Sequence, residues 1–136
     1  MMCRFFFYSF LLVTASSCRT VHTASSTALL LDTRWVIEQI DGKAVAEDAP
    51  EAYITLQSGE AQTVSGNTGC NAISGTFRVA DGGLTFSGVA MTRRACLNAN
   101  IESEFTGVLS RTAAYRISGG KLILTDGKND IAVFKK

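Results

Sequence analysis

The sequence predicts an α+β domain, with an antiparallel sheet of about seven or eight strands packed on, or curled around, one amphipathic helix. Three observations support this prediction. Short β-branched and aromatic runs recur along the chain, glycine-containing turns separate several of them, and a single segment shows helical spacing of its apolar residues. The net charge is nearly balanced, with 13 basic and 12 acidic residues, so it gives no indication of nucleic-acid binding.

The first strands are predicted at residues 33–40 (TRWVIEQI) and 52–57 (AYITLQ). The first is rich in β-branched and aromatic residues, which favour strands. The second alternates, and this places Ile54 and Leu56 on one face. A turn is predicted at the DGKAV segment between these two strands.

Two hairpins come next in the chain. Residues 72–80 and 83–92 flank an Asp-Gly-Gly turn, a strong hairpin signal because glycine accepts positive φ without steric cost. In this hairpin we expect Phe77 and Val79 to face Leu84 and Phe86. Residues 114–118 and 121–126 form the second hairpin around Gly-Gly, and residues 131–136 close the chain as a further strand.

The helix is predicted over about residues 99–112. Its apolar residues are Ile101, Phe105, Val108 and Leu109. Their spacing forms one apolar stripe. Asn98 or Asn100 is placed to cap the first turn, where Glu102 also complements the helix dipole.

The N-terminus has the pattern of an export signal. Residues 5–15 form an apolar run after Arg4. Because a bilayer-spanning helix needs about 20 apolar residues, the run is typical of a secretory signal instead. Ala15-Ser16-Ser17-Cys18 then resembles a bacterial lipobox, so we expect residues 1–17 to be a lipoprotein signal peptide and Cys18 to carry the lipid. The alternative is a plain secretory signal in which Cys18 is an incidental thiol.

The remaining chain divides into residues 18–28, rich in Ser, Thr and Ala and predicted to be a membrane tether, and residues 29–136, a single domain. Once Cys3 is removed with the signal and Cys18 is lipidated, Cys70 and Cys96 remain. An even number of cysteines in an exported protein predicts a disulfide. Two separate buried thiols are the alternative.

Several classes of site are not supported by the residues. The single histidine, His22, lies in the tether, so a Ser–His or Cys–His pair has no base within the domain. His22 and two cysteines do not supply four ligands for a metal. Glu102 and Glu104 lie on different faces of the predicted helix, so they do not form a cooperating acid–base pair. The sequence also has no basic block of the kind that binds nucleic acid. Taken together, these observations predict a protein that is not an enzyme, has no cofactor and does not bind nucleic acid.

Two polar segments leave alternatives open. Residues 65–71 (SGNTGCN) are expected to form a tight connection, with unusual φ angles at Gly66 and Gly69, or else a polar rim beside a groove. Arg93 and Arg94 are either a solvated strand end or a surface that faces a protein partner or anionic headgroups.

The motif Gly69-Cys70-Asn71, with Gly75 four positions later, precedes Thr92-Arg93 and Cys96 at a characteristic spacing. With an early tryptophan and a closing pair of strands, this resembles the META domain family of HslJ-like, heat-inducible bacterial lipoproteins over residues 33–134. The resemblance implies a sheet curled into an incomplete barrel, similar to the lipoprotein pilots of type III secretion secretins. It supplies no catalytic residues, and it leaves open whether the motif is structural or binds a ligand.

The function expected from the resemblance is that of a non-enzymatic, monomeric, lipid-anchored protein, in envelope integrity or tolerance of heat and novobiocin. Arg19 follows Cys18, where an aspartate would signal inner-membrane retention, so we expect the outer membrane, facing the periplasm. One alternative is a carrier that holds a lipid or other apolar ligand in the barrel. The large side chains that would line it are Trp35, Phe77, Phe86, Phe105, Tyr115 and Phe134. The other is a periplasmic protein-interaction or inhibitor module.

Overall fold

The computed structural model describes residues 23–97 and 100–136. The predicted signal peptide, Cys18 and the predicted capping residue Asn98 lie outside the described residues. Within them there are two helices, α1 (Thr23–Leu30) and α2 (Asn100–Arg111), and one antiparallel sheet. The nine strands of the sheet are β1 (Arg34–Ile40), β2 (Lys43–Ala44), β3 (Ala52–Leu56), β4 (Thr63–Thr68), β5 (Ala72–Ala80), β6 (Gly83–Met91), β7 (Ala114–Ser118), β8 (Lys121–Thr125) and β9 (Asp130–Lys135).

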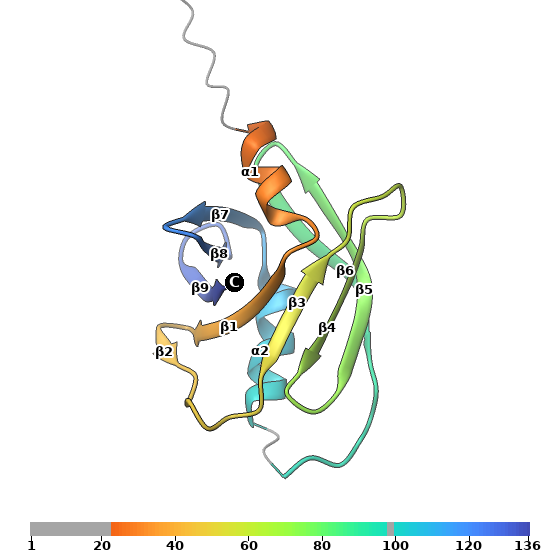
Figure 1. Cartoon of the computed structure of the whole chain (residues 1–136), viewed down its shortest axis with the longest axis vertical. Helices are drawn as coiled ribbons and strands as arrows, with labels where there is room; N and C mark the ends of the chain where they lie inside the picture. Colours follow the sequence, from red (N-terminus) through yellow and green to blue (C-terminus); the bar gives the residue numbers. More distant parts are fainter. Residues whose placement is uncertain (1–22, 98–99) are drawn as a thin grey trace, which may run out of the picture.

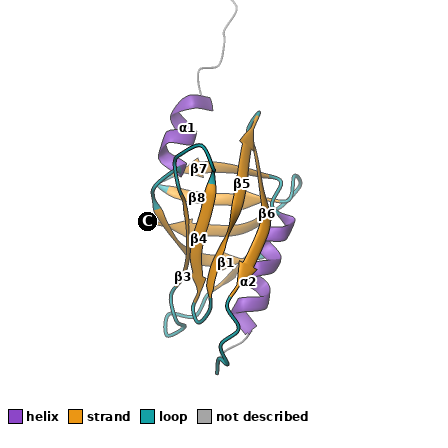
Figure 2. Cartoon of the chain, turned by 90° about the vertical axis from the view of Figure 1, so that its right-hand side faces the viewer, coloured by secondary structure: helices purple, strands orange, loops and turns teal. Residues whose placement is uncertain are grey.

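The sheet curls into a ring that is open on one side. Its strand order is β2-β1-β3-β4-β5-β6-β7-β8-β9, and β1 pairs with β9 as well. The weak point is between β6 and β7, which share the single residue pair Gly83–Ala114. Helix α2 connects these two strands and lies beside the opening, in contact with β6, β4 and β1 (Figure 2). The predicted α+β class and incomplete barrel are therefore confirmed.

The first hairpin shows how the sequence specifies the register. Asp81 and Gly82 both have positive φ, at 52° and 80°, as a two-residue turn that matches the twist of the strands requires. The resulting register pairs Phe77 with Phe86 and Val79 with Leu84, as predicted. A bulge between Ser74 and Thr76 then shifts the pairing toward the other end of the hairpin.

Helix α2 begins and ends within one residue of the prediction. Its inner stripe, Phe105, Val108 and Leu109, is buried in the barrel, and Ile101 is half-buried. The Phe105 ring meets the Phe134 ring edge to face, with centroids 6.2 Å apart. Burying each such side chain stabilises the fold by about 2 kcal/mol.

Helix α1 begins in the segment predicted as a tether and ends two residues inside the predicted domain, and its C-terminal end packs against the barrel (Figure 1). Leu30 is fully buried, and its carbonyl accepts a 3.0 Å hydrogen bond from Trp35 Nε1. The hydroxyl groups of Thr27 and Tyr115 lie 3.0 Å apart. This helix was not predicted from the sequence, because its small residues show no apolar stripe. Neither described helix is long and apolar enough to cross a bilayer.

Candidate functional site

The two cysteine motifs meet at the end of the barrel opposite α1 (Figure 1). One supplies the turn between β4 and β5, residues 69–71, which we call the distal turn. The other supplies the loop after β6, residues 92–97, which we call the distal loop. The predicted disulfide between Cys70 and Cys96 joins them, with Cα atoms 6.1 Å apart.

Asn71 holds the distal loop from within the protein. Only 1% of the residue is exposed. Its Oδ1 accepts hydrogen bonds from the Arg94 backbone N–H at 2.7 Å and from the Thr92 hydroxyl at 2.8 Å. Its Nδ2 donates to the Arg94 carbonyl at 3.2 Å. Both backbone polar groups of Arg94 are therefore bound by one buried amide, and this fixes the loop without regular secondary structure.

Glu102 completes this buried polar cluster from the first turn of α2. Its Oε2 accepts hydrogen bonds from Asn71 Nδ2 at 2.8 Å and from the Thr68 hydroxyl at 2.9 Å. Thr68 is 1% exposed, and no buried side-chain nitrogen or oxygen among the described residues lacks a partner. By accepting these two hydrogen bonds, the Glu102 carboxylate ties the first turn of α2 to the end of β4 and to Asn71.

Asn71 is a site residue predicted from the sequence, but its partner Glu102 is not. Glu102 was assigned to the helix dipole, and it does lie in the first helical turn. It lies 31 residues from Asn71, and no local pattern links the two. Only the placement of α2 across the end of β4 brings the carboxylate to the amide.

The glycines of this region differ in their roles. Gly69 has φ of 95°, as predicted for the turn. Gly66 was expected to need an unusual φ as well, and this is wrong: it lies inside β4, where a Cβ would overlap the Tyr53 carbonyl oxygen on β3. Gly75 has a similar constraint, because a Cβ would come within 3.0 Å of Val89 Cα across the bulge. Close backbone approach, rather than φ, excludes a side chain at Gly66 and leaves little room for one at Gly75.

Two clefts border the distal loop. The first, of about 460 Å³, lies between the disulfide, Pro50, Arg94 and the start of α2; we call it the loop cleft. The second, of about 470 Å³, lies between β2, the segment after it and α2; we call it the helix cleft. Pro50, Leu97 and Ile101 line both clefts, so the two clefts adjoin each other.

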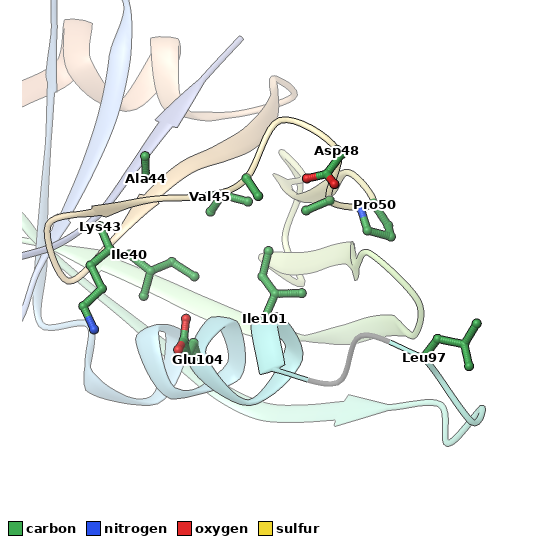
Figure 3. A pocket seen from close by; sticks show the side chains of 11 residues that line it. Ile40, Lys43, Ala44, Val45, Asp48, Pro50, Leu97, Ile101 and Glu104 are labelled. Carbon is green, nitrogen blue, oxygen red and sulfur yellow. The ribbon is translucent and has the colours of Figure 1, made fainter.

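Figure 3 shows the arrangement of the helix cleft. Ile40, Val45 and Ile101 form its apolar part, with Lys43 and Glu104 on one side. Leu97 lies at the other side and is fully exposed. Both clefts are within the size range of small binding sites. The helix cleft mixes apolar surface with three charged residues, whereas the loop cleft has one, Arg94.

The six aromatic residues considered as ligand-lining do not meet at one mouth. Trp35, Phe105 and Phe134 are fully buried, and Phe77 and Tyr115 are buried in the same core. Phe86 alone is half-buried, and it lines a separate groove of about 410 Å³ between β6 and α2. The large side chains therefore fill most of the barrel interior themselves.

Some charged groups of the described residues form ion pairs, and others, including those around the two clefts, do not. Four exposed ion pairs join Arg34 to Glu51, Arg111 to Asp41, Arg116 to Asp130 and Lys121 to Glu38. The hydrogen bond from Lys121 lowers the pKa of Glu38, and that from Arg116 lowers the pKa of Asp130. Around the two clefts, Lys43, Asp48, Glu104 and Arg94 have no ion pair with a described residue. Nor do residues 23–97 and 100–136 contain a cluster of three metal-binding side chains.

Comparison with known proteins gives a consistent result. The model of the META domain family matches residues 28–136. Heat shock protein HslJ of Escherichia coli (strain K12) is 31% identical over 101 residues, which cover 72% of this chain and 70% of that protein. A protein from Burkholderia xenovorans solved by NMR is 27% identical with a TM-score of 0.60, over 94% of this chain and 97% of that one. Another NMR structure is 28% identical with a TM-score of 0.61, over 79% of this chain and 92% of the other.

Proposed function

The chain belongs to the META domain family, and from this premise we propose that it is a non-enzymatic, lipid-anchored protein of the bacterial cell envelope that contributes to tolerance of heat and other envelope stress. The observation that carries the proposal is the 31% identity to a heat shock protein over most of both chains. The lipobox-like Ala15-Ser16-Ser17-Cys18 supports the anchor. Two or more acyl chains on one cysteine give stable membrane attachment, whereas one chain gives marginal binding.

The absence of an enzymatic role in this proposal rests on two observations. The META domain family is not a known enzyme family. In addition, the carboxylate of the buried polar cluster, Glu102, is engaged as an acceptor by Asn71 and Thr68. The core packing of the aromatic residues gives no comparable support to the carrier alternative. We therefore propose that the protein acts by binding at its surface.

The anchor is tested by metabolic labelling with radioactive palmitate in a bacterium that expresses the full chain. We expect the wild type and the matched control Cys3→Ala to be labelled and to fractionate with membranes. Cys18→Ala is expected to be unlabelled. A labelled Cys18→Ala variant, or an unlabelled wild type, would show that Cys18 is not the lipidated residue.

The stress role is tested by deleting the gene in its host and measuring survival after a heat shift and in novobiocin. We expect survival to fall in the deletion strain and to be restored by the wild type but not by Cys18→Ala at equal protein abundance. Equal survival with and without the gene would contradict the role. Full rescue by Cys18→Ala would separate the stress role from the anchor.

A further inference from the structure

The distal loop is exposed and yet fixed in place. Arg93 and Arg94 are exposed, and Leu97 is one of two large apolar side chains exposed among the described residues. Beyond one backbone bond from Thr92 to Ala72, the loop is held by Asn71 and by the disulfide. A rigid scaffold that presents an irregular loop is a common arrangement for binding, since little conformational entropy is then lost on association.

The charges of the loop are unmatched by the described part of the protein. Arg93 and Arg94 take no part in the four ion pairs. Glu102, the acidic residue beneath the loop, is turned inward to Thr68 and Asn71. Both arginines are exposed, and Arg94 lines the loop cleft, so the loop offers two positive charges to acidic groups supplied from outside. Arginine is among the residue types enriched at protein interfaces, in part because it binds carboxylates with two hydrogen bonds.

The position of the loop argues against the chain's own membrane as its partner. This step rests on the proposed function, because it requires the anchor at Cys18. Residues 18–22 reach at most about 18 Å from the start of α1 when fully extended. The distal loop lies at the opposite end of the barrel (Figures 1 and 2), and the nine-residue strand β5 alone spans about 30 Å. The loop therefore lies at the end of the barrel far from the anchor, and this favours a partner outside the bilayer that holds the anchor.

We propose that the distal loop and the loop cleft form a docking site for a segment of another protein that carries acidic side chains beside an apolar one. The acidic groups bind Arg93 and Arg94. The apolar side chain packs in the loop cleft against Pro50, Leu97 and Ile101. An apolar anchor in a cleft beside charged groups is the arrangement that concentrates binding energy in protein interfaces.

A peptide selection tests the proposal. The full chain is immobilised in the state in which it is produced, in detergent if membrane-bound, and probed with a phage library of random dodecapeptides. We expect enrichment of peptides in which acidic residues flank an apolar one. Arg93→Glu/Arg94→Glu is expected to weaken their binding about tenfold or more, and Leu97→Ser to weaken it by a smaller factor. The charge-reversed variant is itself expected to select basic peptides.

A matched control is Arg78→Glu/Lys128→Glu, which makes the same charge change at exposed positions on β5 and in the turn before β9. We expect it to bind the enriched peptides as the wild type does, and thermal melting verifies that all variants fold. The proposal is overturned if no acidic peptide is enriched, or if both double variants lose binding equally. Binding to phosphatidylglycerol vesicles that is lost in Arg93→Glu/Arg94→Glu, without peptide enrichment, would assign the loop to lipid headgroups instead. Palmitate labelling of the same preparation reports separately whether the anchor exists.

Discussion

The β7–β8–β9 meander and the distal end of the barrel are stabilised by different interactions. In the meander, backbone pairing runs along each strand, and the side chains add exposed ion pairs such as Arg116–Asp130 and Lys121–Glu38. At the distal end, the loop of residues 92–97 has no strand pairing beyond the Thr92–Ala72 backbone bond. A disulfide and a buried amide hold it instead.

The difference indicates what each region requires. A hairpin with a continuous ladder is specified by its turn and its apolar face, so its surface charges are free to pair and contribute little. An irregular loop must satisfy its backbone groups individually, which Asn71 does for Arg94. The distal charges remain unpaired among the described residues, which is consistent with a surface that binds rather than one that stabilises.

The largest effect is expected from removing the covalent link at the distal end. The disulfide closes a loop over 26 residues of sequence separation. In the chain-entropy model this contributes about 3.5 kcal/mol to the free energy of unfolding. Urea unfolding of Cys70→Ala/Cys96→Ala is expected to show a loss of about that size. A loss below about 1 kcal/mol would show that contacts other than the disulfide stabilise the distal end.

The next effect is expected from Asn71→Asp, which keeps the shape of the side chain but removes its Nδ2 donor. A second carboxylate is then placed where Asn71 now donates to Glu102 at 2.8 Å. We expect a loss of about 2 to 3 kcal/mol in the free energy of unfolding. Adding Glu102→Gln supplies a donor and is expected to restore part of the loss, as a double-mutant cycle measures. Asn67→Ala, which removes one bond to the Gly69 backbone, is the matched control with a smaller effect.

Additive losses in Asn71→Asp and Glu102→Gln would show that the two side chains do not act as a pair. The distal loop would then depend on Asn71 through Thr92 and Arg94 alone.

The smallest effect is expected in the meander, from Asp130→Asn. Arg116 lowers the pKa of Asp130, so the folded state favours the charged carboxylate. This contribution to stability is present above the ordinary aspartate pKa of about 4 and is lost as the pH falls through the lowered value. The unfolding midpoints of wild type and Asp130→Asn should differ slightly at neutral pH and converge as the pH falls below the lowered pKa of Asp130.

Asp81→Asn is the matched control for this comparison, because Asp81 is exposed in a hairpin turn and takes part in none of the four ion pairs. We expect its midpoint to follow the wild type across the same pH range. A difference for Asp130→Asn that persists at low pH would mean that the ion pair is not its cause.

The two regions also differ in how far the sequence predicts them. The register of the β5–β6 hairpin and the limits of α2 follow from local signals, namely a turn that accepts positive φ and an apolar stripe. The disulfide follows from counting cysteines within the expected export. The Asn71–Glu102 contact does not follow, because it depends on where α2 lies relative to β4. Gly66 was misinterpreted for the same reason, since only the paired strand β3 reveals why a side chain is excluded.

The closure of the ring by β1 and β9 has a consequence for the order of assembly. Ile40 pairs with Ala132, so an early strand lacks one of its neighbours until almost the entire domain has been made. During synthesis from the N-terminus, one edge of β1 therefore stays partly unpaired until β9 has been made. Contacts so distant in sequence also slow folding after release, because a long loop must close first. We expect the ring to close only after its last strand has been made.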